Sequence, residues 1–590
     1  MINLNLSKEA KYLVLVCLSG AIIILLCGIF SDLYLGDETF HYRLATYIYK
    51  ANFQRPLYDP LALTNPSGKC YYYDPMGWHF FLALFWKLFF GVSKASAQVF
   101  QVIWYMLLVL STYLLGTEIR DKKTGLFSAL IVATMPMAVA LSIILHTDIA
   151  VAALCTISLF FLIKKRLLAA ALIIALATYT KRNSYMLLPG FLILTLYPFF
   201  DARSFKDFLK ILTRWFIFFL IPFLIAITPA ITYRYSVFGL RSFISGNIRE
   251  PVETSELKPI ELNLHYVNIT MYHIINNISL DSARYFSAVV PLINIQTQYH
   301  LPQSLAAKPG QQTHFTLTIP VASAPIGEYL NKVHTEKTES KKTGEFLYEY
   351  KGDSVPFYDE SNILINPFAF LKYFGLAIAF AVFLYMIRLK FAKKDIFLWF
   401  LIANYLPLFF YVFKGSFNIR YFSPIIGYIA VMAGMGIASS KAKCLKYLII
   451  FLCIVQFFSV AIYTRMNRII PPGLKQVYSY IAANTPKEAR VLCTKNALAL
   501  HADRNSIWLG TNSLKEINFL FWQASKAQMV EIFDKYDINY ILVEKDKIYD
   551  DSESKHTGGY PKSFVDKIRA LDIFTIVLEN QSAALWKIKR

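Results

Sequence analysis

The chain has 590 residues, a formal net charge of +21 and a composition that is 56% hydrophobic and 16% aromatic. This apolar content excludes an ordinary soluble domain and indicates a protein that crosses a membrane many times. The positive charge does not indicate nucleic acid as a partner, because Lys and Arg lie in short loops between apolar runs and do not form one polar face with aromatic residues.

Apolar runs long enough to cross a bilayer begin near the N-terminus and recur along the chain. The first lacks a small-residue cleavage site after its core, so we expect it to be retained as a helix. The predicted spans are residues 12–30, 97–116, 125–142, 148–163, 167–180, 184–200, 212–232, 366–387, 395–413, 421–439 and 445–463. The run 76–91 is only about sixteen residues long, so it is a re-entrant or juxtamembrane helix or a short span.

Basic loops predict the orientation, because cytoplasmic loops collect Lys and Arg. Every strongly basic loop falls on one side if 76–91 is not counted as a span, whereas most move outside if it is counted. We therefore predict a polytopic α-helical protein of the plasma or inner membrane, with about eleven spans and a cytoplasmic N-terminus. Residues 1–463 form its transmembrane domain, with outer loops 31–96 and 233–365. Residues 464–590 alternate helical patterns with short apolar strands, which predicts a C-terminal extracytoplasmic α/β domain.

Charged residues gather on the predicted outer face. Two adjacent carboxylates, Asp37 and Glu38, follow the first span in "LGDETFHYRLA", and Asp148 falls in a very short outer turn. Four cations occupy outer turns, where the rule for basic loops does not expect them: Lys181, Arg182, Lys414 and Arg420. Simpler explanations stay open, because Asp37 could cap a helix, Asp148 could stabilise a turn, and the cations could reach lipid head groups.

Carboxylates and cations at a membrane surface suggest a reaction on an anionic lipid head group. The cations would hold a phosphate, while Asp37 would take a proton from an incoming nucleophile. Glu38 points about 100° away around the helix, so we assign it to acceptor positioning or a metal.

The same stretch leaves a divalent cation open as the only candidate cofactor. His41 lies four residues after Asp37 on one helix face, although no second His or Cys stands at ligand spacing. Tyr72, His79 and Tyr421 are aromatic candidates for a sugar-binding cleft, and an interfacial belt is the alternative for the first two.

Five stretches, in this order, resemble the GT-C superfamily of membrane glycosyltransferases, in particular the branch with the lipid A aminoarabinose transferases and protein O-mannosyltransferases. They are residues 36–45, 74–93, 135–148, 176–189 and 419–430. The resemblance implies a catalytic acidic residue at Asp37, with Glu38 beside it, and donor or acceptor contacts at Asp148, Lys181 and Arg420. We place Asp148 with Asp37 and Glu38 among the candidate catalytic residues. Asp74 stands where the aminoarabinose branch tends to have Lys, which argues against that donor.

The expected function is therefore inverting transfer of a sugar from an undecaprenyl- or dolichyl-phosphate donor to a hydroxyl or amine of a lipid, glycan or protein acceptor, as in the synthesis of cell-envelope glycans. The alternatives are a secondary transporter or flippase of lipid-linked or anionic substrates and a non-enzymatic scaffold. A transporter should show matching halves and charges near mid-span, whereas here the charges lie at the outer rim.

Overall fold

The structure is a computed structural model that describes residues 7–34, 36–53, 76–196, 205–238, 313–316, 335–339, 346–350, 375–388, 419–494, 497–508, 520, 524–549 and 560–589. Three predictions lie outside these residues: Tyr72, Lys414 and the span 395–413. For Asp37, Arg420 and Tyr421 the backbone is described and the side chain is not.

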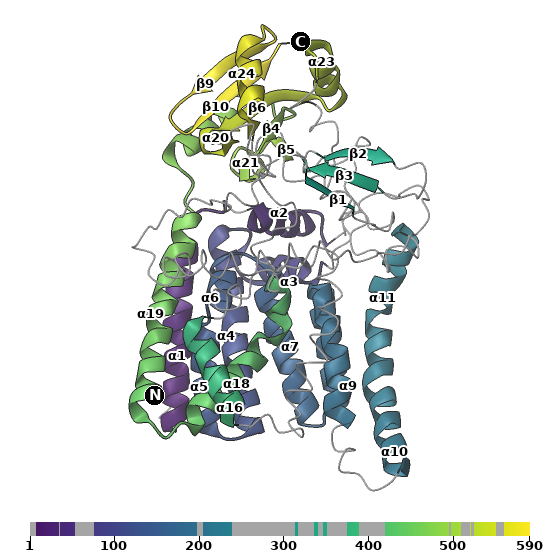
Figure 1. Cartoon of the computed structure of the whole chain (residues 1–590), viewed down its shortest axis with the longest axis vertical. Coiled ribbons are helices and arrows are strands. Elements are labelled where there is room, and N and C mark those ends of the chain that lie inside the picture. Colours follow the sequence, from purple (N-terminus) through teal and green to yellow (C-terminus); the bar gives the residue numbers. More distant parts are fainter. Residues whose placement is uncertain are drawn as a thin grey trace.

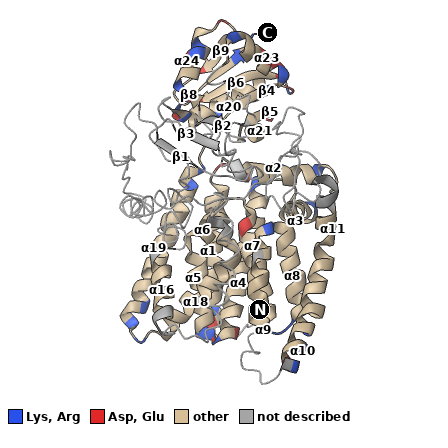
Figure 2. Cartoon of the chain, turned by 45° about the vertical axis from the view of Figure 1, so that its right-hand side comes forward, with Lys and Arg blue, Asp and Glu red and all other residues tan. Residues whose placement is uncertain are grey.

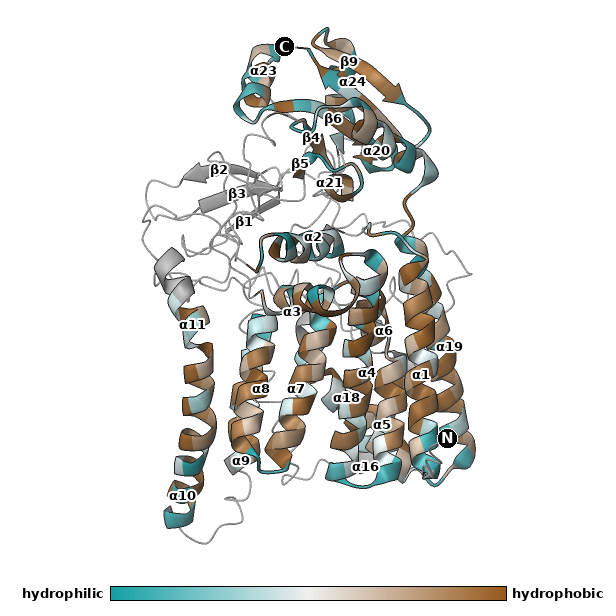
Figure 3. Ribbon diagram, turned by 180° about the vertical axis from the view of Figure 1, so that it is seen from behind, coloured by the Kyte–Doolittle hydropathy of each residue, from teal (hydrophilic) through white to brown (hydrophobic). Residues whose placement is uncertain are grey.

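A bundle of long apolar helices forms the larger part of the molecule, with a smaller unit of strands and helices at one end (Figure 1). Within the described residues, five helices are long and apolar enough to cross a membrane, or six if one bent pair counts as a span. The five are Lys8–Ile29, Lys94–Ile119, Lys206–Thr232, Phe422–Ser439 and Lys443–Asn467. Apolar residues predominate along Lys8–Ile29 and Lys443–Asn467 (Figure 3), most of whose surface is not buried in the protein, whereas Phe422–Ser439 is 89% buried inside the bundle.

The remaining bundle helices are shorter or interrupted. They are α5 (Lys122–Thr134), α6 (Pro136–Ile143), α7 (Thr147–Ile163), α8 (Leu167–Thr180), η2 (Arg182–Leu187), α9 (Leu188–Leu196) and α16 (Leu376–Arg388). The continuous helix predicted for 125–142 is instead the pair α5 and α6, bent by 55°. Pro136 begins α6 after an extended Met135, because proline donates no backbone hydrogen bond and disfavours a helical residue before it.

Two short helices lie across the end of the bundle that faces the small domain (Figure 1): α2 (Gly36–Lys50) and α3 (Gly77–Phe85), which continues as η1 (Trp86–Phe90). α3 and η1 cover the ambiguous run 76–91. They bury Trp78 and Trp86 but expose Leu88, Phe89 and Phe90 by 63–66%. α2 begins at Gly36, so Asp37 lies in its first turn and not at the capping position before it.

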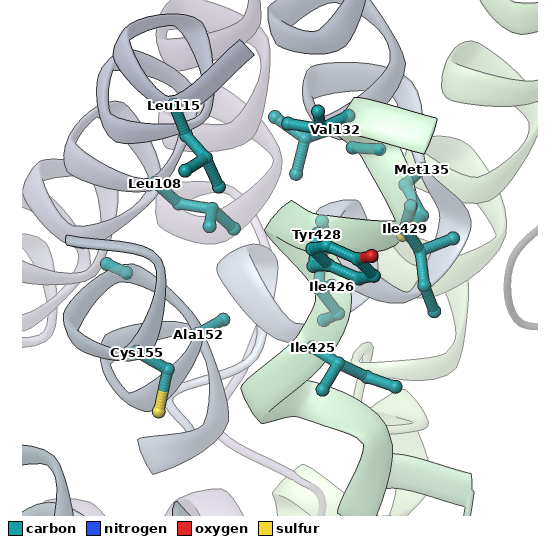
Figure 4. Close-up of a cluster of buried hydrophobic side chains, with 14 of the residues drawn as sticks. Leu108, Leu115, Val132, Met135, Ala152, Cys155, Ile425, Ile426, Tyr428 and Ile429 are labelled. Carbon is teal, nitrogen blue, oxygen red and sulfur yellow. The ribbon is translucent and has the colours of Figure 1, made fainter. Parts of the chain in front are cut away.

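Close packing around α18 (Ile426–Ser439) holds the bundle together. Figure 4 shows Tyr428 and Ile429 of α18 in the apolar cluster that also contains Leu108 of α4 (Lys94–Ile119) and Val132 of α5. A Cβ atom at Gly436 would come within 2.2 Å of the backbone oxygen of Ala381, so only glycine permits this approach of α16 and α18.

The C-terminal unit contains a five-stranded sheet of order β5-β4-β6-β10-β9. β4 (Arg490–Cys493) is parallel to both β5 (Asn505–Trp508) and β6 (Ile538–Glu544), while β10 (Ala583–Ile588) is antiparallel to β6 and β9 (Phe574–Glu579). Helices α20 (Pro472–Asn484), α21 (Ala497–His501), α23 (Lys526–Lys535) and α24 (Lys562–Ala570) accompany it. Short elements complete the unit: η6 (Lys545–Lys547), β7 (Ile548–Tyr549) and β8 (Tyr560–Pro561).

The unit continues directly from the last bundle helix, α19 (Lys443–Asn467), which ends at Arg468. Two further helical elements are α1 (Lys8–Ile29) and the short η5 (Ile419–Ile425). A peripheral helix is built of α10 (Phe205–Trp215), η4 (Phe216–Leu220) and α11 (Ile221–Phe238). A small antiparallel sheet has the strand order β1 (Thr313–Thr316), β3 (Phe346–Tyr350) and β2 (Thr335–Glu339).

Candidate active site

Asp148 is the centre of a polar cluster at the end of the bundle that faces the C-terminal unit. Its carboxylate is completely buried in the first turn of α7. Lys181 Nζ lies 2.8 and 2.7 Å from its two oxygens, and the Ser423 hydroxyl donates to Oδ1 at 2.8 Å. The ring of His146 also contacts the carboxylate through Nδ1. Partners from three separate chain segments therefore hold one carboxylate at a helix N-terminus, where a negative charge is stabilised.

The backbone around this cluster is held by a buried amide. Gln101 Nε2 lies within hydrogen-bond distance of the carbonyl oxygens of Leu141, Ile144 and His146, at 2.8, 3.1 and 2.8 Å. Leu141 lies in the last turn of α6, Ile144 follows that helix and His146 precedes α7, so one side chain spans the junction between the two helices. Lys181 directly follows α8 and has an extended backbone conformation, which turns its side chain out of the helix.

A row of imidazoles connects α2 to the cluster. His41 Nδ1 lies 2.8 Å from Nε2 of His79, so the two rings share one hydrogen bond between a protonated and an unprotonated nitrogen. The His41 ring also meets the His146 ring edge-on, with centroids 5.0 Å apart. His79 is only 2% exposed, and Gly77 brings its helix against α8, because a Cβ there would lie 2.7 Å from the Tyr179 carbonyl oxygen. The backbone of Asp37 lies one turn before His41 on α2.

Glu38 lies in a different environment from the one that its sequence position suggested. Its side chain and that of Arg468 are both completely buried. Arg468 Nε and Nη2 lie 2.9 and 2.7 Å from Oε2, and the Tyr34 amide donates to Oε1 at 2.8 Å. Glu38 is thus the buried partner of a cation that lies 430 residues further along the chain.

Comparison with known proteins identifies the architecture. Residues 74–226 match the family model described as dolichyl-phosphate-mannose-protein mannosyltransferase. The fold is similar to an oligosaccharyltransferase from Archaeoglobus fulgidus, with a TM-score of 0.53, 13% identity, and coverage of 91% of this chain and 70% of that one. It is also similar to ArnT from Cupriavidus metallidurans, with a TM-score of 0.53, 10% identity, and coverage of 98% of both chains. No curated protein sequence matches the chain.

The fold is that of the GT-C glycosyltransferases. The predicted resemblance is confirmed, and the protein is an integral membrane protein built of helices, as the apolar runs indicated. At these identities the solved structures establish the fold alone, so the roles of individual residues depend on the geometry of this chain.

That geometry brings some of the predicted site residues together. Asp148 and Lys181 form a direct ion pair, and Arg182 follows Lys181 at the start of η2. The backbone of Arg420 and Tyr421 lies in η5, the same short helix that supplies Ser423. Their predicted roles stay predictions, as do those of Asp37, Lys414 and Tyr72.

Three site residues were not assigned a role from the sequence: His146, Ser423 and Arg468. Arg468 follows the last predicted span on the outer side, so it is the same kind of exception to the rule for basic loops as Lys181, and that signal could have found it. His146 stands next to Asp148 but shows no ligand spacing in the sequence. Ser423 carries no charge, and no pattern of spacing distinguishes it.

Among the described residues, no three His, Cys, Asp or Glu side chains are grouped so that they could hold one ion. Of the three predicted ligands, Glu38 is paired with Arg468 and His41 bonds His79. The third is Asp37, whose side chain is not described, so a divalent cation at this site stays a prediction.

Proposed function

We propose that the protein is an inverting glycosyltransferase that moves a sugar from a polyprenyl-phosphate donor to a hydroxyl or amine acceptor. The observation that carries this proposal is the Asp148 cluster, in which a cation and a buried carboxylate meet at one end of a GT-C bundle. Asp37 lies on α2, whose His41 ring contacts the His146 ring of this cluster. The oligosaccharyltransferase from A. fulgidus has been captured in complex with an inhibitory peptide and a dolichol-phosphate. That complex supports a lipid phosphate as the donor group.

Lys181 is the proposed contact to the donor phosphate. Its side chain is 20% exposed while its ammonium group bonds the buried Asp148, so the lysine lies at the edge of the cluster and not inside it. Asp148 accepts from Lys181 and Ser423 and contacts His146, which leaves it poorly placed to take a further proton. We therefore assign Asp148 to orienting Lys181, and we assign Arg182, Lys414 and Arg420 to the same phosphate.

Asp37 is the proposed general base. An acceptor hydroxyl is a weak nucleophile until a base removes its proton, whereas a lipid phosphate leaves readily once cations stabilise its charge. The acceptor oxygen attacks the anomeric carbon, the bond to the phosphate oxygen breaks, and the proton passes to Asp37. One displacement of this kind inverts the anomeric configuration.

The reaction is proposed to occur on the extracytoplasmic face. Lys and Arg gather at the end of the bundle that lies away from the C-terminal unit (Figure 2), and two of the clusters there are 120–123 and 164–166. Because basic loops stay in the cytoplasm, the Asp148 cluster and the C-terminal unit are then outside.

This orientation predicts opposite labelling of two exposed lysine positions, Lys122 and Lys487. In a background with Cys70, which lies in the predicted outer loop, and the exposed Cys444 both replaced by Ser, an impermeant thiol reagent should label Lys487→Cys in intact cells. It should label Lys122→Cys only after the membrane is opened. The reverse pattern would place the Asp148 cluster in the cytoplasm and contradict the orientation.

The function is tested by incubating the purified protein with a panel of labelled polyprenyl-phosphate sugars and candidate acceptors. We expect one donor to be consumed, with release of polyprenyl phosphate and a product of inverted anomeric configuration by NMR. A protein that binds a donor and moves it across vesicles without consuming any member of the panel would instead be a transporter or flippase.

A further inference from the structure

Residues 31–34, which follow α1, and Glu38 in the first turn of α2 are bound to the beginning of the C-terminal unit. The Asp32 amide donates to the Arg468 carbonyl at 2.9 Å, and the Ile470 amide donates to Asp32 Oδ2 at 2.9 Å. Lys475 Nζ of α20 lies 2.8 Å from the same oxygen. Although burial opposes it, the contacts from Lys475 and Ile470 hold the pKa of Asp32 below its ordinary value, so these bonds persist at neutral pH.

Other elements of the C-terminal unit bind the same segment. His501 of α21 donates from Nε2 to the Leu33 carbonyl at 2.9 Å. The Tyr34 hydroxyl lies 3.4 Å from Glu544 Oε2 at the end of β6, and the Thr494 hydroxyl holds that carboxylate through Oε1 at 2.6 Å. The Tyr34 ring belongs to the apolar cluster of α20, β4 and β6. The sheet domain therefore contacts the segment from several sides.

The ion pair between Glu38 and Arg468 is the central contact of this attachment. Arg468 donates from Nε to Glu38 at 2.9 Å and from Nη1 to the Ser31 hydroxyl at 2.7 Å, and its Nη2 lies 2.7 Å from Glu38 Oε2 as an ion-pair contact. Both charged side chains are removed from water. Separating them would leave each charge buried without its partner, which costs much free energy. A planar guanidinium with several fixed donors also sets the orientation of the carboxylate that it binds.

Glu38 is the residue next to Asp37 in the first turn of α2, so the position of one backbone determines the position of the other. We propose that Arg468 is a positioning residue, which sets the height and rotation of Asp37 by holding Glu38. The C-terminal domain is then part of the catalytic unit and not an appended module. This inference rests on the proposed role of Asp37 as general base.

A positioning role predicts that kcat falls while donor affinity does not change. Arg468→Lys keeps the charge but cannot bond Glu38 and Ser31 together, and Glu38→Gln keeps the shape but loses the charge. Because a shift of about 1 Å in a reacting group can cost about a hundredfold, each variant should lower kcat by about that factor. The dissociation constant for undecaprenyl phosphate, used as the binding probe, should stay unchanged.

Arg504→Lys is the matched control. Arg504 is buried, as Arg468 is, but it lies within the C-terminal unit. It binds the Thr485 hydroxyl and the carbonyls of Ala482 and Thr485. The Arg504→Lys variant should lower the melting temperature of the protein without lowering kcat. A loss of kcat in Arg504→Lys equal to that in Arg468→Lys would overturn the proposal, since it would reflect general damage to the domain.

A distance measurement tests the attachment without relying on activity. Spin labels at Asp37→Cys and Lys487→Cys should give a narrow distance distribution in the parent, a broad one after Arg468→Lys and a narrow one after Arg504→Lys. A narrow distribution after Arg468→Lys would refute the positioning role.

Two further variants keep the inference separable from the proposed function. If Asp37→Asn loses turnover while Arg468→Lys keeps it, the inference fails and the function stands. If Asp37→Asn keeps turnover, the general-base assignment itself fails. Should Arg468→Lys not fold, Ser31→Ala removes one acceptor of Arg468 without changing a charge, and a reduction of kcat by about fivefold is expected from the lost hydrogen bond. No reduction would contradict the inference.

Discussion

Asp37→Asn is expected to lower turnover by roughly 10²- to 10⁴-fold, the usual contribution of a general base. Asn has the size of Asp but cannot accept a proton, so the acceptor hydroxyl would have to attack without losing its proton to the protein. Donor binding and membrane insertion should stay normal, because the substitution removes no contact to the phosphate. The measurement is kcat with the donor identified in the panel, together with the dissociation constant for undecaprenyl phosphate.

Asp121→Asn provides the control for this substitution. Asp121 caps α5 by accepting from the Thr124 amide at 2.7 Å, and the Thr124 amide together with nearby cations holds its pKa below the ordinary value. Asn caps a helix as well as Asp does, so turnover should not change. Near-parent turnover in both variants would mean that Asp37 is not the base.

Lys181→Ala should weaken donor binding by roughly ten- to a hundredfold, because a charge-assisted hydrogen bond to a phosphate contributes about 1.5 to 3 kcal/mol. The measurement is the dissociation constant for undecaprenyl phosphate. Lys164→Ala is the matched control, because Lys164 pairs with Glu118 and lies in the basic turn 164–166 at the opposite end of the bundle. Thermal unfolding should be followed as well, since Lys181→Ala leaves the buried Asp148 with fewer partners.

Asp148→Asn separates the two roles that a buried carboxylate could have beside Lys181. If Asp148 orients the lysine, the variant should weaken binding of undecaprenyl phosphate, because the ammonium loses its fixed partner. If Asp148 were the general base, kcat would fall and binding would not change. Unchanged affinity in both Lys181→Ala and Asp148→Asn would show that these residues do not hold the phosphate.

Features that depend only on residues close together in the sequence could be predicted from it. Apolar runs of spanning length predicted the helices of the bundle, because a helix in lipid must bond all its own backbone groups. The helical patterns and short apolar strands predicted for 464–590 are present as elements such as α20, β4 and β6. The break at Pro136 was missed, because 125–142 was predicted as one continuous helix, although its cause is a single residue.

The candidate site was predictable only in part. Charges in short outer turns identified Asp148 and Lys181, because an ionisable group beside lipid is costly unless it has a function or a partner. The sequence could not tell that the two residues bond each other, because 33 residues and all of α8 separate them. It also could not indicate that Ser423, an uncharged residue of η5, completes the cluster.

The tertiary structure decided which charged groups found each other. Asp37 and Glu38 are adjacent and chemically alike, and the sequence placed both near an acceptor. Folding gives Glu38 a buried arginine from the far end of the chain, and the Tyr34 amide also donates to its carboxylate. The length of an apolar run is a property of one segment of the sequence, whereas the partner of a buried charge depends on which distant segment packs against it.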